Sequence, residues 1–146
     1  MRSLLKESYM KNITIQIIKT ANIEQLIAIY KDAGWWKEEN DGIDPSFIQK
    51  IIDGSFCFAT ASHEGRIIGM GRSISDGVSD AYIQDVAVLR DYRGKGIGKM
   101  IMDEIVNFLK SKKITWIGLI AEPNAVSFYD KYGFSRMQNY VPFIQN

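Results

Sequence analysis

The chain has 146 residues, a formal net charge of +1 from 18 basic and 17 acidic side chains, and 46% hydrophobic residues. This size fits one folded domain, and the balance of charge excludes a broad electrostatic field for nucleic acid or an anionic membrane. No apolar run reaches the roughly 20 residues that span a bilayer, and no secretory signal pattern opens the chain. We therefore expect a cytoplasmic protein with neither nucleic-acid nor membrane partners.

The first 11 residues show no sustained periodicity and are expected to form a flexible segment before a single domain over 12–146. Residues 13–18 mostly alternate between apolar and polar side chains, which is typical of a β-strand. Asn22 can cap a helix that ends near Gly34, and Asp44-Pro45 is typical of the start of a second helix.

Three strands are predicted next, over residues 56–61, 66–74 and 81–89, and their short connections favour an antiparallel meander. From Ile97 the apolar residues recur about every four positions, which predicts an amphipathic helix. A strand over 115–121, a helix over 124–132 and a terminal strand around 137–143 complete the chain. The order βααβββαβαβ predicts an α/β (α+β) fold with a mixed, mostly antiparallel sheet flanked by helices.

The only cysteine and the only histidine give little sign of chemistry of their own. Cys57 sits in the apolar run 56–59, where core packing is favoured over a role as nucleophile. His63 lies in a turn with no second histidine or cysteine beside it, so no metal site is expected.

The loop between the third strand of the meander and the Ile97 helix has the character of an anion site. Three glycines occupy alternate positions in it: Gly94, Gly96 and Gly98. Glycine lets the backbone approach a ligand closely, and the free N–H groups of a helix's first turn attract an anion. Three cations add positive charge: Arg93, Lys95 and Lys99. The loop therefore predicts a pyrophosphate cradle, with a simple tight turn as the alternative.

Two common nucleotide motifs do not fit this loop. The Walker pattern requires Ser or Thr after Gly98-Lys99, where Met100 stands. The dinucleotide fingerprint requires a third glycine at the position of Lys99.

The segment Arg93-x-x-Gly96-x-Gly98 resembles the pyrophosphate-binding signature of the GNAT superfamily of acyl-CoA-dependent N-acetyltransferases. Residues 119–134 resemble that family's second block, which has Asn124, Phe128-Tyr129 and a closing Gly-Phe pair. Together the two blocks cover roughly residues 80–135. The resemblance implies the GNAT fold, with acetyl-CoA as the acyl donor and no metal.

The resemblance also implies roles for individual residues. The backbone of Val86, Ala87 and Val88 would pair with the pantetheine arm as an added strand, with the Val86 N–H near the thioester oxygen. Asn124 would bind the cofactor arm, and Tyr129 would protonate the departing thiolate; its alternative role is that of a core aromatic. The pyrophosphate would be held by the loop and helix start, that is, by Arg93, Gly94, Lys95, Gly96, Ile97, Gly98 and Lys99.

The general base is not evident from the sequence. Several family members, including polyamine and glucosamine-6-phosphate acetyltransferases, carry Glu two residues before the position of Val86, where this chain has Gln84. An amide cannot take a proton, and strand alternation would turn the adjacent Asp85 to the opposite face. A water relay is favoured, with Asp85 and Glu122 as weaker candidates.

In the family, the acceptor pocket lies between the first two helices and the C-terminal strands. The corresponding loop carries Trp35 and Trp36, followed by Glu38, Glu39 and Asp41. An aromatic wall with nearby acids would suit a cationic amine, whereas the alternative is a solvated loop with one tryptophan in the core. Tyr82 shares the face of Gln84, so both are further candidates for the acceptor site.

The favoured function is transfer of acetyl from acetyl-CoA to a primary amine of a small molecule, by direct attack in a ternary complex. The protein would act as a monomer or homodimer. Two alternatives remain: acetylation of protein lysines or N-termini, and a non-catalytic acyl-CoA-binding module.

Overall fold

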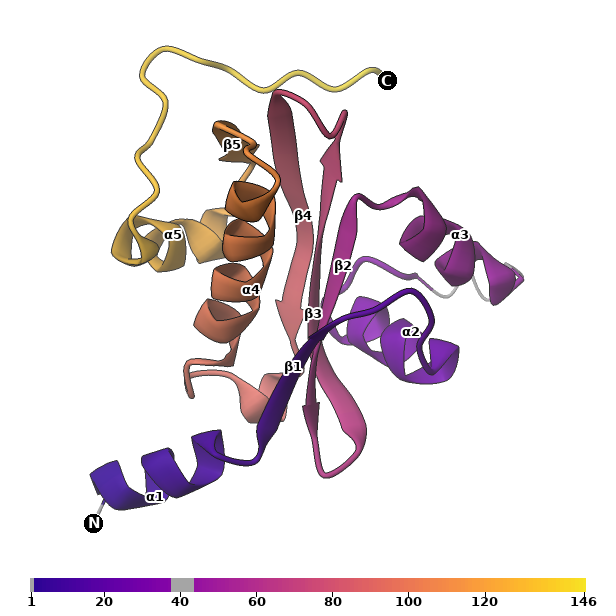
Figure 1. Cartoon of the computed structure of the whole chain (residues 1–146), viewed down its shortest axis with the longest axis vertical. Coiled ribbons are helices and arrows are strands. Elements are labelled where there is room, and N and C mark those ends of the chain that lie inside the picture. Colours follow the sequence, from indigo (N-terminus) through magenta and orange to yellow (C-terminus); the bar gives the residue numbers. More distant parts are fainter. Residues whose placement is uncertain (1, 38–43) are drawn as a thin grey trace.

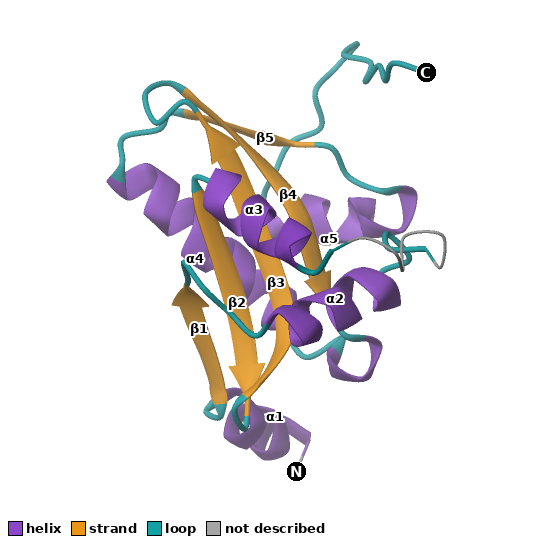
Figure 2. Ribbon diagram, turned by 90° about the vertical axis from the view of Figure 1, so that its right-hand side faces the viewer, coloured by secondary structure: helices purple, strands orange, loops and turns teal. Residues whose placement is uncertain are grey.

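The computed structural model describes residues 2–37 and 44–146 and consists of one sheet with helices on both faces (Figures 1 and 2). None of the helices in these ranges is long and apolar enough to cross a membrane. The elements in chain order are α1 (Arg2–Met10), β1 (Ile13–Ile17), α2 (Ile23–Asp32), α3 (Ser46–Gly54), β2 (Cys57–His63), β3 (Arg66–Ser75), β4 (Asp80–Val88), the 3-10 helix η2 (Arg90–Tyr92), α4 (Ile97–Ser111), β5 (Trp116–Leu119), the 3-10 helix η3 (Pro123–Ala125) and α5 (Val126–Tyr132).

The strands lie in the order β1-β2-β3-β4-β5. The pairs β1–β2, β2–β3 and β3–β4 are antiparallel, whereas β5 runs parallel to β4. Short turns can join antiparallel strands, but a parallel pair needs a longer crossover, which α4 supplies here. The predicted mixed, mostly antiparallel sheet flanked by helices is confirmed.

Helices cover both faces of this sheet. α4 and α5 lie on one face and α2 and α3 on the other (Figure 1). Cys57 is 1% exposed and belongs to the core on the α4 side, as its apolar surroundings predict. α4 buries one stripe of residues spaced about one turn apart, namely Ile97, Ile101, Ile105 and Leu109.

A β-bulge interrupts β4. The register with β3 shifts between Met70 and Arg72, so that Asp85 and Val86 together oppose Gly71. Asp85 has a φ of 55°, a left-handed conformation in which Asp is tolerated better than most residues. An extra residue of this kind bends a strand and disrupts its local pairing.

The structure differs from the sequence-based expectation at both ends of the chain. Residues 134–146 form neither helix nor strand, so the strand predicted around 137–143 is wrong. At the other end, the segment 1–11 contains α1, and Tyr9 packs against His63 with their ring centroids 4.9 Å apart. The flexibility of that segment and the single domain over 12–146 stay predictions.

Candidate functional site

The site begins where β4 and β5 part. Their parallel pairing ends with Ile83 opposite Leu119, while β4 continues through the bulge to Val88. On its other side, this last part of β4 remains paired with β3. Beyond Ile83, β4 therefore has no strand partner on its β5 side among the described residues, which leaves an edge that an extended molecule can pair with.

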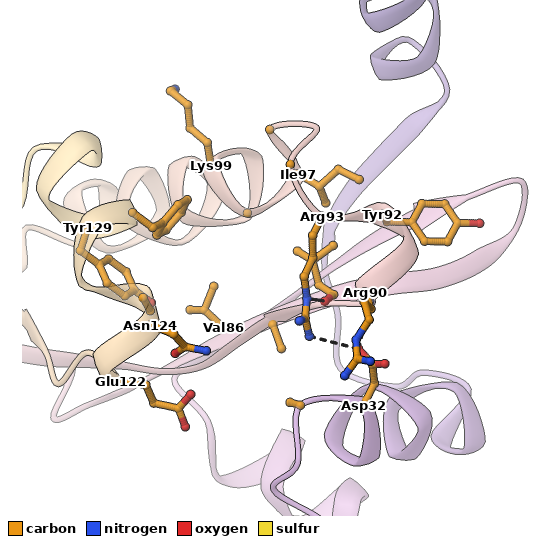
Figure 3. Close-up of a pocket in the computed structure, with 18 of the residues that line it drawn as sticks. Asp32, Val86, Arg90, Tyr92, Arg93, Ile97, Lys99, Glu122, Asn124 and Tyr129 are labelled. Carbon is orange, nitrogen blue, oxygen red and sulfur yellow. Dashed lines mark hydrogen bonds and ion pairs between the residues drawn. The ribbon is translucent and has the colours of Figure 1, made fainter.

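A cavity of about 640 Å³ lies along this edge (Figure 3). It is bounded by the end of β4, the start of α4, the end of α2 and the η3–α5 segment. Most of the sequence-predicted site residues line it: Trp35, Val86, Ala87, Val88, Arg93, Gly94, Gly96, Ile97, Gly98, Lys99, Asn124 and Tyr129.

The start of α4 provides a place for an anion. Gly94 and Gly96 have φ values of 75° and 85°, in the left-handed region that glycine adopts without strain. Gly96 is the N-cap residue, and no side chain caps this 15-residue helix. The N–H groups of its first turn therefore stay available to a ligand at the positive end of the helix dipole.

The charge of Arg93 suggests a contact with pyrophosphate, but its side chain is bound to other residues of the protein. Its Nε donates to the backbone oxygen of Val88 at 2.8 Å, and its guanidinium forms an ion pair with Asp32 at 3.1 Å. Asp32 also accepts the backbone N–H of Arg90 at 3.0 Å. Arg93 thus joins the ends of β4 and α2 at the rim of the cavity, and any contact with pyrophosphate would be additional.

The two lysines of the loop and helix start also have protein partners. Lys99 borders the cavity but forms an ion pair with Asp103 at 2.8 Å, and its side chain extends away from Val86 and Tyr129 (Figure 3). Lys95 lines neither of the two cavities described in this section, and its Nζ lies 4.4 Å from the centroid of the Tyr9 ring.

Tyr129 reaches the cavity from α5, on the same side as Asn124 and Glu122 (Figure 3). Its ring packs against Phe128 and Phe134, at centroid distances of 5.0 and 6.2 Å. Burial, and to a lesser extent the charge of Glu122, raises the pKa of Tyr129 above its ordinary value of 10.0. The phenol therefore carries its proton at neutral pH.

A second cavity, of about 300 Å³, adjoins the first. The two share Trp35 and Glu122, and the indole Nε1 of Trp35 donates a 2.7 Å hydrogen bond to a Glu122 carboxylate oxygen. The remaining lining residues come from β4 and from the end of β5 and the residue after it: Tyr82, Ile83, Gln84, Asp85, Leu119 and Ile120.

Asp85 borders this second cavity but is held by the protein. It accepts the Nε–H of Arg72 at 2.6 Å and the hydroxyl of Tyr30 at 2.9 Å. Burial, followed by the nearby charge of Asp85, raises the pKa of Tyr30. Arg72 also reaches Gln84 at 3.3 Å, so the predicted placement of Gln84 and Asp85 on opposite faces is wrong, because the bulge breaks strand alternation.

The two tryptophans have separate surroundings. Trp35 borders both cavities, whereas Trp36 lines neither and packs edge-on against Phe47, with ring centroids 6.2 Å apart. The acidic residues Glu38, Glu39 and Asp41 lie outside the described residues.

Several residues of the larger cavity were not assigned to the site from the sequence: Asp32, Ala33, Arg90, Tyr92, Ala125 and Phe128. Asp32 and Ala33 come from the end of α2, far from the glycine-rich loop in sequence, and no motif connects them to it. In the part of the chain that the structure describes, no group of three or more His, Cys, Asp or Glu residues could hold a metal ion.

An open strand edge beside a glycine-rich helix start suits a ligand that has both an extended arm and a phosphate group. The chain belongs to the acetyltransferase (GNAT) family, whose model matches residues 22–134. The predicted membership is confirmed, and with it the assignment as an acyl-CoA-dependent N-acetyltransferase.

Known proteins similar to this chain carry the same activity in their names. An uncharacterized N-acetyltransferase, ycf52, from Porphyra purpurea is 32% identical over 130 residues, covering 89% of this chain and 71% of that protein. Histone acetyltransferase TAP1 from Glycine max is 31% identical over 119 residues, covering 77% of this chain and 52% of that protein. A probable acetyltransferase of known structure from Staphylococcus aureus is 26% identical, with a TM-score of 0.76 over 92% of this chain and 99% of that one.

Proposed function

We propose that this protein transfers acetyl from acetyl-CoA to a primary amine of a small molecule, by direct attack in a ternary complex. The observation that carries the proposal is the junction of the two cavities. The larger follows the open β4 edge to the start of α4, the smaller opens beside it, and Tyr129 lies in the larger close to residues that border both. A donor and an acceptor could therefore meet there. The cytoplasm is the proposed location.

The donor would bind mainly through the backbone. The pantetheine arm would pair with the open edge of Val86, Ala87 and Val88, with the Val86 N–H directed at the thioester oxygen. The pyrophosphate would lie on the amides between Gly94 and Lys99. Asn124, which projects into the larger cavity from η3, would hydrogen-bond the arm near the thioester.

Tyr129 would act as general acid. When the tetrahedral intermediate collapses, the carbon–sulfur bond breaks, and the thiolate needs a proton. A phenol with a raised pKa holds one throughout the physiological range. Tyr129 lines the larger cavity from α5, the helix that follows Asn124, and this position supports the role of general acid.

The acceptor would occupy the smaller cavity, with Trp35, Tyr82 and Gln84 as its contacts. A volume of about 300 Å³ is at the lower end of the range for small-molecule sites, which supports a small amine. The Glycine max relative, named a histone acetyltransferase, favours a protein lysine as the second candidate acceptor. A thiol-release screen with 2-phenylethylamine, spermidine, glucosamine and a lysine peptide would separate the two.

The first test is Tyr129→Phe. We expect kcat to fall about 10²-fold or more, with acetyl-CoA affinity unchanged, because only the proton donor is lost. Steady-state kinetics and calorimetry would measure the two quantities. Tyr132→Phe is the matched control on the same helix, because the Tyr132 hydroxyl donates a hydrogen bond to Asp103 and Tyr132 lines neither cavity. Full activity in Tyr129→Phe would overturn the acid role, and acetyl-CoA binding without transfer to any tested amine would overturn the proposed function.

A further inference from the structure

Three carboxylates border the two cavities, and their partners differ. Asp32 forms an ion pair with Arg93, and Asp85 forms one with Arg72. The Glu122 carboxylate accepts its hydrogen bond from the neutral indole of Trp35. Among these three, Glu122 alone is not paired with a guanidinium, so a proton on its carboxylate would break no ion pair with Arg72 or Arg93.

Glu122 also lies where a proton has to be removed. It borders both the donor and the acceptor cavity, and it is close enough to Tyr129 to raise the pKa of that phenol. In Figure 3 Glu122, Asn124 and Tyr129 lie together at the left of the view, and the Arg93–Asp32 pair lies to their right. An amine placed between the cavities would have Glu122 beside it.

The reaction needs such a group. A primary amine with a pKa near ~10 is mostly an ammonium ion at neutral pH and cannot attack a carbonyl. Gln84 cannot accept its proton, and a proton on Asp85 would break the hydrogen-bonded ion pair with Arg72. Neither of these two β4 residues is therefore available as the base.

We propose that Glu122 is the proton acceptor for the amine and that Trp35 holds its carboxylate at the junction of the cavities. The assignment rests on the proposed function. The ammonium gives one proton to Glu122, and the freed nitrogen lone pair forms the C–N bond to the thioester carbon. Collapse breaks the C–S bond, and the thiolate takes the Tyr129 proton. The nitrogen's second proton restores the Tyr129 phenol, and Glu122 releases its own to solvent.

Several charged or titratable groups share the two cavities with Glu122 and would influence its titration. They are Tyr129 from α5, Tyr82 and Asp85 from β4, Asp32 from α2, Arg90 and Tyr92 from η2, Arg93 from the loop after η2, and Lys99 from α4. Because these groups stay unchanged in a Glu122 variant, a difference between its pH profile and that of the wild type reports on Glu122.

The test is Glu122→Gln, which keeps the shape and an oxygen for the Trp35 hydrogen bond but cannot take a proton. With the best amine of the screen, we expect kcat/KM at neutral pH to fall about 10²-fold, while acetyl-CoA affinity by calorimetry stays unchanged. The loss should shrink as the pH rises toward the pKa of the amine, near ~10, because free amine is then supplied by solution. It should also shrink for a β,β-difluorinated analogue of that amine, which is less basic.

Control variants separate this role from a merely structural one. Glu122→Asp should recover part of the activity, and Glu24→Gln, an exposed change outside both cavities, should match the wild type. Trp35→Phe, which removes the indole N–H, should lower kcat about tenfold or less, since the base remains but is no longer held. A Glu122→Gln defect that is constant across pH and amine basicity, or no defect, would overturn the assignment. An inactive wild type would instead contradict the proposed function.

Discussion

Asp85 illustrates how the contacts of one residue can hold neighbouring elements together beside the site. It carries the bulge in a left-handed conformation and pairs with Arg72 at 2.6 Å, with side-chain exposures of 24% and 15%. The pair links β4 to β3, and the hydrogen bond from the Tyr30 hydroxyl to Asp85 connects α2 to both strands. Losing the charge of Asp85 would leave a mostly buried guanidinium without its partner.

We therefore expect Asp85→Asn to lower the free energy of unfolding by about 2–4 kcal/mol, since breaking a largely buried pair leaves an uncompensated charge. Asn also tolerates the left-handed conformation, so the backbone is not strained. Asp130→Asn is the matched control, because Asp130 pairs with Arg136 at the same 2.6 Å but with side chains 41% and 68% exposed. The control Asp130→Asn should lower the free energy of unfolding, measured by urea denaturation, by less than about 1 kcal/mol. If the two variants lost the same free energy of unfolding, the argument from burial would be contradicted.

The position of Asp85 also marks the limit of sequence reasoning at this scale. Strand alternation places neighbouring side chains on opposite faces, yet Gln84 and Asp85 both contact Arg72 and border one cavity. The bulge that causes this has no glycine in β4, and Asp85 is the only residue in it that favours the left-handed conformation. Glu122 could be named from the sequence, but its hydrogen bond to Trp35 spans 87 positions and appears only in the fold.

At the scale of elements, the packing of α4 against β3 depends on two glycines. A Cβ at Gly71 would lie 2.8 Å from the Ile105 side chain, 2.9 Å from that of Ile101 and 3.2 Å from that of Val86. A Cβ at Gly69 would lie 2.9 Å from Ile101. The helix can therefore lie this close to the sheet only where β3 has no side chain.

Gly71→Ala should lower the free energy of unfolding by about 1–3 kcal/mol, because an extra methyl group overpacks this contact. It should also weaken acetyl-CoA binding, because the added carbon presses on Val86. Thermal unfolding and calorimetry would measure both effects. Gly54→Ala is the control, since a Cβ there meets nothing within 4 Å. Unchanged stability in Gly71→Ala would show that the neighbours move aside freely.

Most elements could be predicted because their signals are local. The apolar spacing from Ile97 gave α4, and Asn22 caps α2 by accepting the Gln25 N–H at 3.2 Å. The terminal strand over 137–143 could not be judged locally, because a strand also needs a hydrogen-bonded neighbour, and β5 pairs only with β4 within the described residues.

At the scale of the whole molecule, the N-terminal helix contacts the loop that precedes α4. Tyr9 lies against His63 and beneath Lys95, and the Met10 side chain is 3.7 Å from where a Cβ of Gly96 would be. A segment that precedes the family match therefore contacts the proposed pyrophosphate site. No sequence motif indicates this contact.

Tyr9→Ala should weaken acetyl-CoA binding about two- to fivefold, the equivalent of losing a cation–π contact of 0.5–1 kcal/mol that holds Lys95 in place. Calorimetry with acetyl-CoA would measure the change. Leu4→Ala on the same helix is the control, because Leu4 is 69% exposed. Equal affinity for Tyr9→Ala and wild type would show that α1 does not support the loop.

At the fork between β4 and β5, the two proposed sites bind their ligands through different kinds of groups. The proposed donor site consists largely of main-chain groups at Val86–Val88 and at the start of α4, which remain after most side-chain substitutions outside the glycines. The proposed acceptor site consists of side chains, such as Trp35 and Tyr82, which single substitutions replace. New acceptor preferences could therefore evolve by point mutation without loss of the acetyl donor.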